Sequence, residues 1–291
     1  MKKDTIVITG GAGFVGSNLI SLLLKKTKYK IISIDNYSSG SIKNHIIGRR
    51  VKYIKGDTRD IIRLLKKPKT LNSIFHFGEF ARIYQSFLNM NDCINSNTIG
   101  SNAVFNFCLK HNIKLIYSAT SATLGNNGND KNLSPYAFTK AKNLELLENL
   151  KKWFNFKFEV IYFYNVYGPN QICNGKMATV IGIFENCFKK NKPITIVKPG
   201  TQSRRFTHIF DTVNICYLAW KNNKCRHYSI SNHKIYTILE VAKMFGSKIK
   251  FLSQRPGERY ASALSNLNLK NKVFKHFGKI NLKDYIKNIT K

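Results

Sequence analysis

Tyr136 and Lys140 have the residue types and the spacing of a general base and its activating cation. Ser134 and Pro135 precede them as an expected N-cap and first helical residue, so the two side chains should lie on one face of a helix. Lowering the tyrosine pKa from about 10 to about 7 takes about 4 kcal/mol, which an ammonium group and a second positive charge close by can supply together. Thr120, at the end of the preceding expected strand, offers a hydroxyl to the same reacting oxygen. Since Tyr and Lys often fall four apart by chance, the pair indicates catalysis only beside a binding site for a second, positively charged reactant.

A glycine-rich turn near the start of the chain has the context of such a site. It follows the β-branched run 5–9 and opens into the apolar-periodic segment 14–24, which reads as a helix. Its glycines fit two spacings, G-x-x-G-x-x-G (Gly10, Gly13, Gly16) and G-x-G-x-x-G (Gly11, Gly13, Gly16). Backbone N–H groups and a helix N-terminus there would hold a pyrophosphate. Asp35 ends the next expected strand, about 20 residues further on, where a carboxylate accepts from the ribose hydroxyls of NAD.

Strands and helices alternate through the first half of the chain. We expect strands at 5–9, 29–34, 51–55, 73–77, 114–118 and 158–164, and helices at 14–24, 61–65, 95–111 and 134–153. Such alternation predicts an α/β fold, a doubly wound parallel (Rossmann) sheet. Polar residues stand at the carboxyl ends of these strands, where ligands of such sheets gather. They are Thr9, Asp35, Asp57, His76, Thr120 and Asn165.

Beyond Gly168-Pro169 the alternation weakens. We expect helices at 177–188, 211–220 and 236–245, and short strands at 194–197, 228–230 and 249–252. This pattern predicts an NAD-binding domain over residues 1–168, with a returning segment near 206–231. Residues 169–291 would form mainly a smaller substrate-binding lobe.

The composition is strongly basic, with 48 Lys+Arg against 15 Asp+Glu, a formal net charge of +33. The lysines are spread over every segment, and there is no long basic block or zinc-ligand spacing, so the charge favours anionic substrates over nucleic acid. The six cysteines form no C-x-x-C pair, no run of 18 apolar residues exists, and Met1 leads almost directly into a strand. These features predict a cytoplasmic protein without a metal site, signal peptide or membrane span.

Several motifs together resemble the extended short-chain dehydrogenases/reductases of the NAD-dependent epimerase/dehydratase family, over essentially the whole chain. They lie at 9–18 (TGGAGFVGSN), 35–36 (DN), 56–60 (GDTRD), 76–78 (HFG), 97–102 (NTIGSN), 118–125 (SATSATLG), 135–140 (PYAFTK), 164–169 (YNVYGP), 204–211 (RRFTHIFD) and 255–258 (RPGE).

The resemblance implies roles for particular residues. Tyr136 as phenolate would take the proton of a sugar hydroxyl, Lys140 would bind the nicotinamide ribose and lower the tyrosine pKa, and Thr120 would hydrogen-bond the substrate oxygen. The implied NAD-binding residues are Gly10, Gly13, Phe14, Val15, Gly16, Asp35, Asn36, Asp57, Thr58, Phe77 and Lys140. Asn165, Arg204 and Arg255 match positions near the diphosphate of a nucleotide sugar. Relatives pair the helices equivalent to 95–111 and 134–153, so a homodimer is expected.

The residues after Thr120 help to choose among the family's reactions. Dehydratases of the family place Asp-Glu there, whereas this chain has Ser121-Ala122, which favours an epimerase, and 4-epimerisation of a UDP-hexose in particular. The alternatives are a reductase, dehydratase or decarboxylase of the same fold, or a non-catalytic scaffold that binds NAD or nucleic acid. Departures from the family pattern leave the sugar open. They are the short link from Gly125 to Tyr136, Leu124, Tyr162, Arg205, and Glu79 in a run of normally small residues.

Two of the remaining polar residues have more than one interpretation. His76, in an apolar strand, reads as a hydrogen-bonded structural histidine rather than a catalyst. Glu79 could line the site or be a solvated or paired carboxylate.

Overall fold

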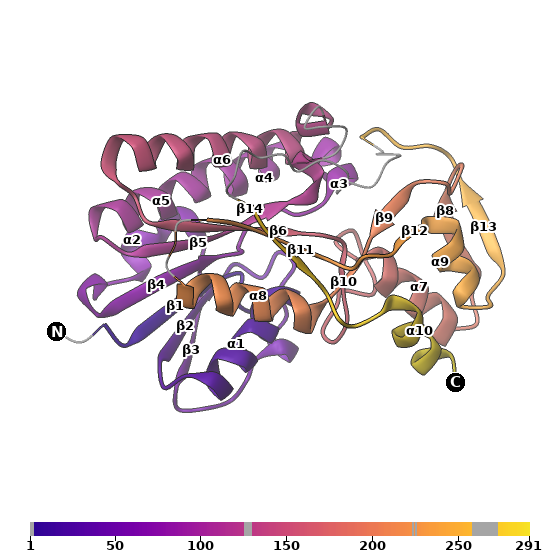
Figure 1. Cartoon of the computed structure of the whole chain (residues 1–291), viewed down its shortest axis with the longest axis horizontal. Helices are drawn as coiled ribbons and strands as arrows, with labels where there is room; N and C mark the ends of the chain where they lie inside the picture. Colours follow the sequence, from indigo (N-terminus) through magenta and orange to yellow (C-terminus); the bar gives the residue numbers. More distant parts are fainter. Residues whose placement is uncertain (1–2, 125–129, 223, 225, 258–272) are drawn as a thin grey trace.

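The protein is built on one sheet of eight parallel strands (Figure 1). The structure is a computed structural model that describes residues 3–124, 130–222, 224, 226–257 and 273–291, with backbone only for 273–277. The strands run across the sheet as β14(Val273–Phe277), β11(His227–Ser231), β6(Phe158–Phe163), β5(Lys114–Thr120), β4(Leu71–His76), β1(Thr5–Thr9), β2(Lys30–Asp35) and β3(Val51–Lys55). The predicted α/β doubly wound parallel sheet is confirmed. Gly125, Cys225 and Glu258, named or counted above, lie outside the described residues.

Helices cover both faces of the sheet, which explains why inner strands such as β1 and β6 are buried along almost their whole length. In β1, Ile6 and Ile8 face α1(Phe14–Lys26) and α8(Ile209–Asn222), while Val7 faces the opposite cluster. That second cluster is built with α2(Ile61–Leu64), α5(Ser101–Lys110) and α6(Pro135–Phe154). Figure 1 shows these two helical layers on opposite sides of the sheet.

The order of the strands reverses between β1 and β4. The chain builds outwards from β1 through β2 to β3, then returns to the other side of β1 and continues through β4, β5 and β6. A crevice opens at such a reversal, at the carboxyl ends of the strands. The residues expected at strand ends are therefore brought to one edge of the sheet.

The segment expected as one helix over 95–111 is interrupted. A π-helical turn, Asn95–Gly100, precedes α5, and two short helices, α3(Ile83–Leu88) and α4(Met90–Ile94), come before it. The Asn97 side chain accepts from the Phe80 N–H (2.7 Å) and donates to its carbonyl (3.0 Å). The extra residue of the π turn thus lets Asn97 hold the loop that follows β4.

The smaller lobe has a separate core of buried apolar residues. Its helices are α7(Val180–Lys189), α9(Ile238–Met244) and α10(Leu282–Thr290), and its strand pairs are β8(Ile194–Val197) with β13(Ile249–Leu252), and β9(Ser203–Arg205) with β12(Ile235–Thr237). A third pair, β7(Val166–Tyr167) with β10(Thr207–His208), lies where this lobe meets the main sheet (Figure 1). The division at residue 168 stays a proposal.

The C-terminal part of the chain returns to the main sheet. β11 pairs with β6, and β14 adds an outer strand beside β11. The sequence pattern predicts the return near 206–231 but not β14, which lies in the segment assigned to the lobe. Among the helices of the described residues, none has both the length and the apolar character needed to cross a membrane.

Candidate active site

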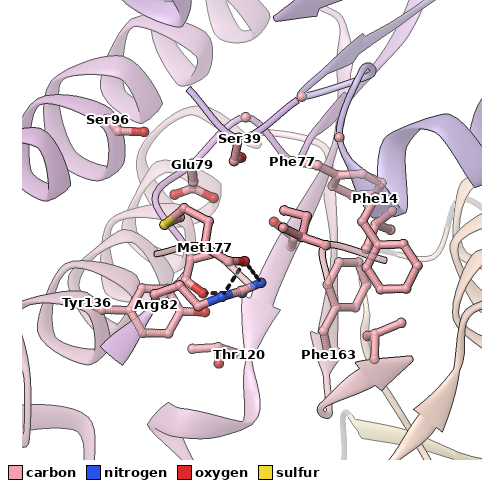
Figure 2. A pocket seen from close by; sticks show the side chains of 18 of the residues that line it. Phe14, Ser39, Phe77, Glu79, Arg82, Ser96, Thr120, Tyr136, Phe163 and Met177 are labelled. Atoms are coloured by element: carbon pink, nitrogen blue, oxygen red, sulfur yellow. Dashed lines mark hydrogen bonds between the residues drawn. The ribbon is translucent and has the colours of Figure 1, made fainter. Parts of the chain in front are cut away.

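A cavity of about 490 Å³ lies at the carboxyl ends of β1, β2, β4 and β5 and reaches the smaller lobe. Most of the residues expected to bind cofactor or substrate line it. They are Gly10, Gly13, Phe14, Val15, Gly16, Asp35, Asn36, Thr58, Phe77, Thr120, Tyr136, Lys140, Asn165 and Arg204. Asp57 and Arg255 are outside this lining, although their neighbours Thr58, Pro256 and Gly257 belong to it. Figure 2 shows the rings of Phe14, Phe77 and Phe163 on one side of the cavity, with Tyr136, Thr120 and Arg82 on the other.

The glycine turn has no room for side chains at its two ends. Gly10 has a φ of +72°, and a Cβ there would lie 2.8 Å from the Phe77 carbonyl carbon. A Cβ on Gly16 would lie 2.2 Å from the Gly10 oxygen. Gly13 is the N-cap of α1 and has no side-chain cap, so the first N–H groups of the helix stay available at the cavity. This cradle fits the pyrophosphate of a dinucleotide.

Asp35 is a buried carboxylate at the end of β2. It accepts from the Ala12 N–H (2.9 Å) and the Tyr37 N–H (2.8 Å), and burial raises its pKa despite these bonds. The carboxylate thus ties the glycine turn to the segment after β2 and stays at the cavity wall, where the predicted ribose contact would be made.

Asp57 makes its contacts within the protein. It accepts from Asn36 Nδ2 (3.1 Å) and from the Arg59 side chain (2.9 Å). Partial burial works against its charge, but the hydrogen bonds from Arg59 and Asn36 outweigh burial and lower the pKa of Asp57. Its predicted contact with adenine stays a prediction.

The start of α6 presents the expected base. The Ser134 side chain caps the helix by accepting from the Ala137 N–H (3.0 Å), and Pro135 is the first helical residue. Tyr136 is buried at the cavity, and its backbone N–H donates to Ser86 Oγ (3.2 Å). Thr120 ends β5 in the same part of the cavity (Figure 2). The sequence thus brings these side chains to one place, and their catalytic roles stay predictions.

Lys140 is held by a buried ion pair that the sequence did not predict. Its Nζ pairs with Glu79 Oε2, donates to the Ser118 carbonyl (2.5 Å) and lies 4.7 Å from the centre of the Tyr117 ring. The Lys140 and Glu79 side chains are only 4% and 2% exposed. Burial lowers the pKa of Lys140, while the Glu79 carboxylate acts in the opposite direction.

The other oxygen of Glu79 is surrounded by donors. Glu79 Oε1 accepts from Ser101 Oγ (2.8 Å), Tyr117 OH (3.0 Å) and Asn143 Nδ2 (3.2 Å). The carboxylate is therefore paired and hydrogen-bonded, which answers the question left open by the sequence, and it also lines the cavity.

His76 is fully buried behind this pair. Its Nε2 lies 3.0 Å from Ser101 Oγ, and its Nδ1 lies 2.7 Å from Thr9 Oγ1. Since the Ser101 hydroxyl donates to Glu79, it accepts from His76 Nε2–H, and Nδ1 then accepts from Thr9. Burial lowers the pKa of His76 to about 4, so the ring is neutral and supports the structure.

Arg82, three residues after Glu79, is a cavity residue that sequence reasoning missed. Its guanidinium donates to the Met177 and Ala178 carbonyls, which joins the loop after β4 to the smaller lobe (Figure 2). Burial lowers the pKa of Arg82, and the nearby Tyr136 acts in the opposite direction. A basic residue so soon after a strand end was the available signal, but basic residues are common throughout this chain.

The expected substrate-binding residues lie at the lobe side of the cavity. Asn165 has a φ of +34° and donates to the Arg205 carbonyl (2.8 Å). Arg204 comes from β9 and lines the cavity. The guanidinium of Arg255 lies 4.9 Å from the centre of the Tyr84 ring, and Tyr84 itself lines the cavity. No group of three or more potential metal ligands occurs within the described ranges.

This arrangement agrees with a comparison against protein families. The model of the NAD dependent epimerase/dehydratase family matches residues 6–231, most of the chain. The chain belongs to this family. Its members are NAD-dependent, so the predicted family and the predicted cofactor, NAD, are both confirmed.

Individual relatives of the family differ in their sugars. A putative UDP-glucose 4-epimerase of Methanocaldococcus jannaschii is 26% identical over 273 residues, which is 88% of each chain. An ADP-L-glycero-D-manno-heptose-6-epimerase of Fusobacterium nucleatum is 26% identical, over 81% of this chain and 77% of its own. Among solved structures, the UDP-N-acetylglucosamine 4-epimerase of Methanobrevibacter ruminantium, in complex with UDP-N-acetylmuramic acid, is 26% identical. It aligns over 100% of this chain and 97% of its own, with a TM-score of 0.82.

These similarities establish an enzyme of the NAD-dependent epimerase/dehydratase family and leave its substrate open.

Proposed function

We propose that this enzyme is a nucleotide-sugar epimerase, and that it inverts carbon 4 of a UDP-hexose through a transient keto-sugar. The observation that carries the proposal is the convergence of Tyr136, Lys140 and Thr120 on the cavity that also contains the glycine turn. A base, a cation and a hydroxyl beside a dinucleotide cradle are the groups that oxidation of a sugar alcohol needs.

The roles of these residues follow from their chemistry. NAD⁺, when bound, supplies a hydride acceptor that can later return the hydride. Tyr136 as phenolate takes the proton of the sugar hydroxyl and returns it to the ketone oxygen after the sugar has turned its other face. Thr120 donates a hydrogen bond to that oxygen, and Lys140 favours the phenolate and holds the nicotinamide ribose. The substrate is isomerised with no net redox change.

The carboxylates of the cavity support an epimerase over a dehydratase. Eliminating water needs an acid and a base beyond the tyrosine, whereas Ser121 and Ala122 follow Thr120. Within the described part of the lining, the carboxylates are Asp35, at the glycine-turn end, and Glu79, which is paired with Lys140. Neither is available as a general acid beside Thr120.

A diphosphate fits the lobe side of the cavity. Arg204 lines this side, Arg255 lies close by over Tyr84, and Asn165 stands between the sheet and β9. Guanidinium groups suit phosphate oxygens because they can donate two parallel hydrogen bonds. The formal net charge of +33 also favours the approach of an anionic substrate.

The test is incubation of the purified protein, without added cofactor, with UDP-glucose and separately with UDP-galactose, followed by NMR of the products. We expect each sugar to yield the other, and Tyr136→Phe to lower the rate by about 10²–10⁴-fold. Tyr164→Phe is the matched control, because its buried hydroxyl contacts Ser229 and lies outside the cavity lining.

Other outcomes would redirect the proposal. A product with an altered carbon skeleton would favour a dehydratase or decarboxylase, and stoichiometric consumption of reduced cofactor would favour a reductase. Wild-type activity in Tyr136→Phe would contradict the catalytic assignment. Activity only on ADP-heptose would retain epimerisation and replace the hexose.

We also propose that the enzyme is a cytoplasmic homodimer. Large apolar side chains are exposed on α6 and the π-helical turn, including Phe138, Trp153 and Ile99. Exposed apolar groups on neighbouring helices are typical of subunit interfaces. Sedimentation should show a dimer that Ile99→Glu/Phe138→Glu converts to a monomer; a monomeric wild type would contradict the proposal.

A further inference from the structure

We propose that Glu79 is a positioning residue for the reaction proposed above, because its carboxylate keeps the Lys140 ammonium charged and directed at the cavity. The inference rests on the proposed function for its kinetic effect. Its effect on NAD binding depends only on the cofactor site.

Glu79 has the contacts that a protein needs to hold a charged carboxylate in its interior. Oε2 pairs with Lys140 Nζ, and Oε1 accepts from three side chains, those of Ser101, Tyr117 and Asn143. An ion pair removed from water is favourable only when hydrogen bonds satisfy the rest of both groups, and this carboxylate meets that condition.

The pair also faces the cavity, since both Glu79 and Lys140 line it. Lys140 Nζ has three N–H donors, of which one serves Glu79 and one the Ser118 carbonyl. The third has only a long contact within the described protein, 3.4 Å to Ser118 Oγ, and is available to a ribose hydroxyl. Glu79 and Ser118 thus orient the ammonium for the cofactor.

A directed chain of hydrogen bonds connects Glu79 to the glycine turn. Thr9 donates to His76, His76 to Ser101, and Ser101 to Glu79. Thr9 Oγ1 also accepts from the Phe77 and Gly78 N–H groups, which start the loop that carries Glu79. The base of the cofactor turn and the lysine are therefore held by one network.

Titratable groups face Lys140 from every element packed around it. They are His76 at the end of β4, Glu79 in the loop that follows, Tyr117 on β5 and Cys93 on α4. Tyr136, one turn earlier on the same helix, lines the same cavity. Of these groups, Glu79 is the one that carries a carboxylate. Burial lowers the pKa of Lys140, and Glu79 is the main group that opposes it. Without this carboxylate, Lys140 should lose its proton at a lower pH.

The test compares Glu79→Gln with Glu159→Gln. Glu159 is a fully buried carboxylate paired with Lys114 (3.2 Å), so this control also removes a buried lysine partner, but outside the cavity lining. In Glu79→Gln the decline of kcat/KM at alkaline pH should begin at least about one pH unit lower than in wild type. Relative to wild type, kcat/KM at alkaline pH should therefore fall about tenfold more than kcat/KM near neutrality. Glu159→Gln should keep the wild-type profile.

A purely structural role would lower activity equally at all pH values, so a Glu79→Gln profile of wild-type shape would overturn the proposal. If Glu79→Gln does not fold, Glu79→Ala tests the same loss of charge with the small side chain usual at this position. Glu79→Asp should restore the alkaline limb at least in part, and its failure to do so would also count against the proposal.

NAD⁺ binding separates this inference from the proposed function. The affinity of nucleotide-stripped protein for NAD⁺ should fall as the pH rises. We expect this fall to begin at a lower pH in Glu79→Gln than in wild type. If the wild type epimerises no UDP-sugar but the two binding curves separate in this way, the proposed function fails and the role of Glu79 stands. Parallel binding curves would overturn the role of Glu79 even in an active epimerase.

Discussion

Two buried lysine–carboxylate pairs lie near opposite ends of β5. Lys114, the first residue of the strand, pairs with Glu159 of β6, and Lys140 pairs with Glu79 beside Ser118, near the strand's carboxyl end. Their carboxylates are 0% and 2% exposed. The two pairs have the same chemistry and similar burial, so their differences come from what surrounds them.

The pair at the amino end is surrounded by backbone. Lys114 donates to the Ala219 and Trp220 carbonyls at the end of α8, and Glu159 accepts from the Lys224 and Arg226 N–H groups. These contacts hold the segment that connects α8 to β11 against the amino ends of β5 and β6.

The pair at the carboxyl end is surrounded mainly by side chains and opens onto a cavity. The comparison teaches that a buried ion pair is a functional candidate when its partners are side chains that direct it at a ligand space, and a structural one when they are backbone.

Substitutions in the two pairs should differ most in their effect on catalytic activity. Lys140→Met should lower kcat by about 10²–10⁴-fold, because Tyr136 loses its activating ammonium. Lys114→Met should leave kcat within about twofold, since its contacts fix backbone far from the cavity lining. Steady-state kinetics on the substrate found for the wild type measures both, and equal losses would remove the distinction.

The same substitutions should differ less in their effect on the free energy of unfolding. Lys140→Met leaves Glu79 buried without its cation and should cost about 3–5 kcal/mol of unfolding free energy. Lys114→Met likewise leaves the fully buried Glu159 without its cation, although two backbone N–H groups still donate to it, and should cost a similar amount, about 3–5 kcal/mol. Urea unfolding followed by tryptophan fluorescence provides the values, and a loss several kcal/mol larger in one variant than in the other would contradict the similar energetics expected from their similar burial.

Acid should destabilise the folded protein through His76, which is buried beside the carboxyl-end pair. Burial lowers the pKa of His76 from 6.5 to about 4. Between these two pH values the unfolded chain therefore binds a proton that the folded protein does not bind. Stability is therefore full above pH 6.5 and falls by up to about 3 kcal/mol towards pH 4. Thermal unfolding of His76→Gln against pH should lose this component. An unchanged pH dependence would show that His76 is not its source.

The smallest expected effect is that of Ser101→Ala. It removes the hydroxyl between His76 Nε2 and Glu79 Oε1, while Tyr117 and Asn143 still donate to the carboxylate. We expect a loss of about 1–2 kcal/mol in unfolding free energy and a modest fall in kcat. Ser134→Ala, which removes an N-cap of similar energetic value, is a comparison for the size of the effect.

Much of the fold and of the cavity can be predicted from local patterns. The glycine turn, the acid at the end of β2 and the helical spacing of Tyr136 and Lys140 are all set within short segments. The strand ends then meet because parallel strands share one direction. Most of the residues that these patterns predict to bind cofactor or substrate line the cavity.

The pairing of Glu79 with Lys140 was not predictable in the same way. The two residues are 61 positions apart, and their contact depends on how a loop after β4 packs against α6. In sequence, Glu79 resembles any polar loop residue, and Arg82 is one of 48 basic residues. The short strands β9 and β12 lack a distinct pattern for a related reason, because three paired residues, rather than periodicity, define them.

The position of β14 has a consequence for synthesis of the chain. As the polypeptide leaves the ribosome, the seven other strands of the main sheet emerge by residue 231, but the outer edge of β11 has no neighbour until residues 273–277 follow. A nascent chain stalled in this interval would expose unpaired backbone groups to other chains, so this stretch of translation carries a risk of aggregation.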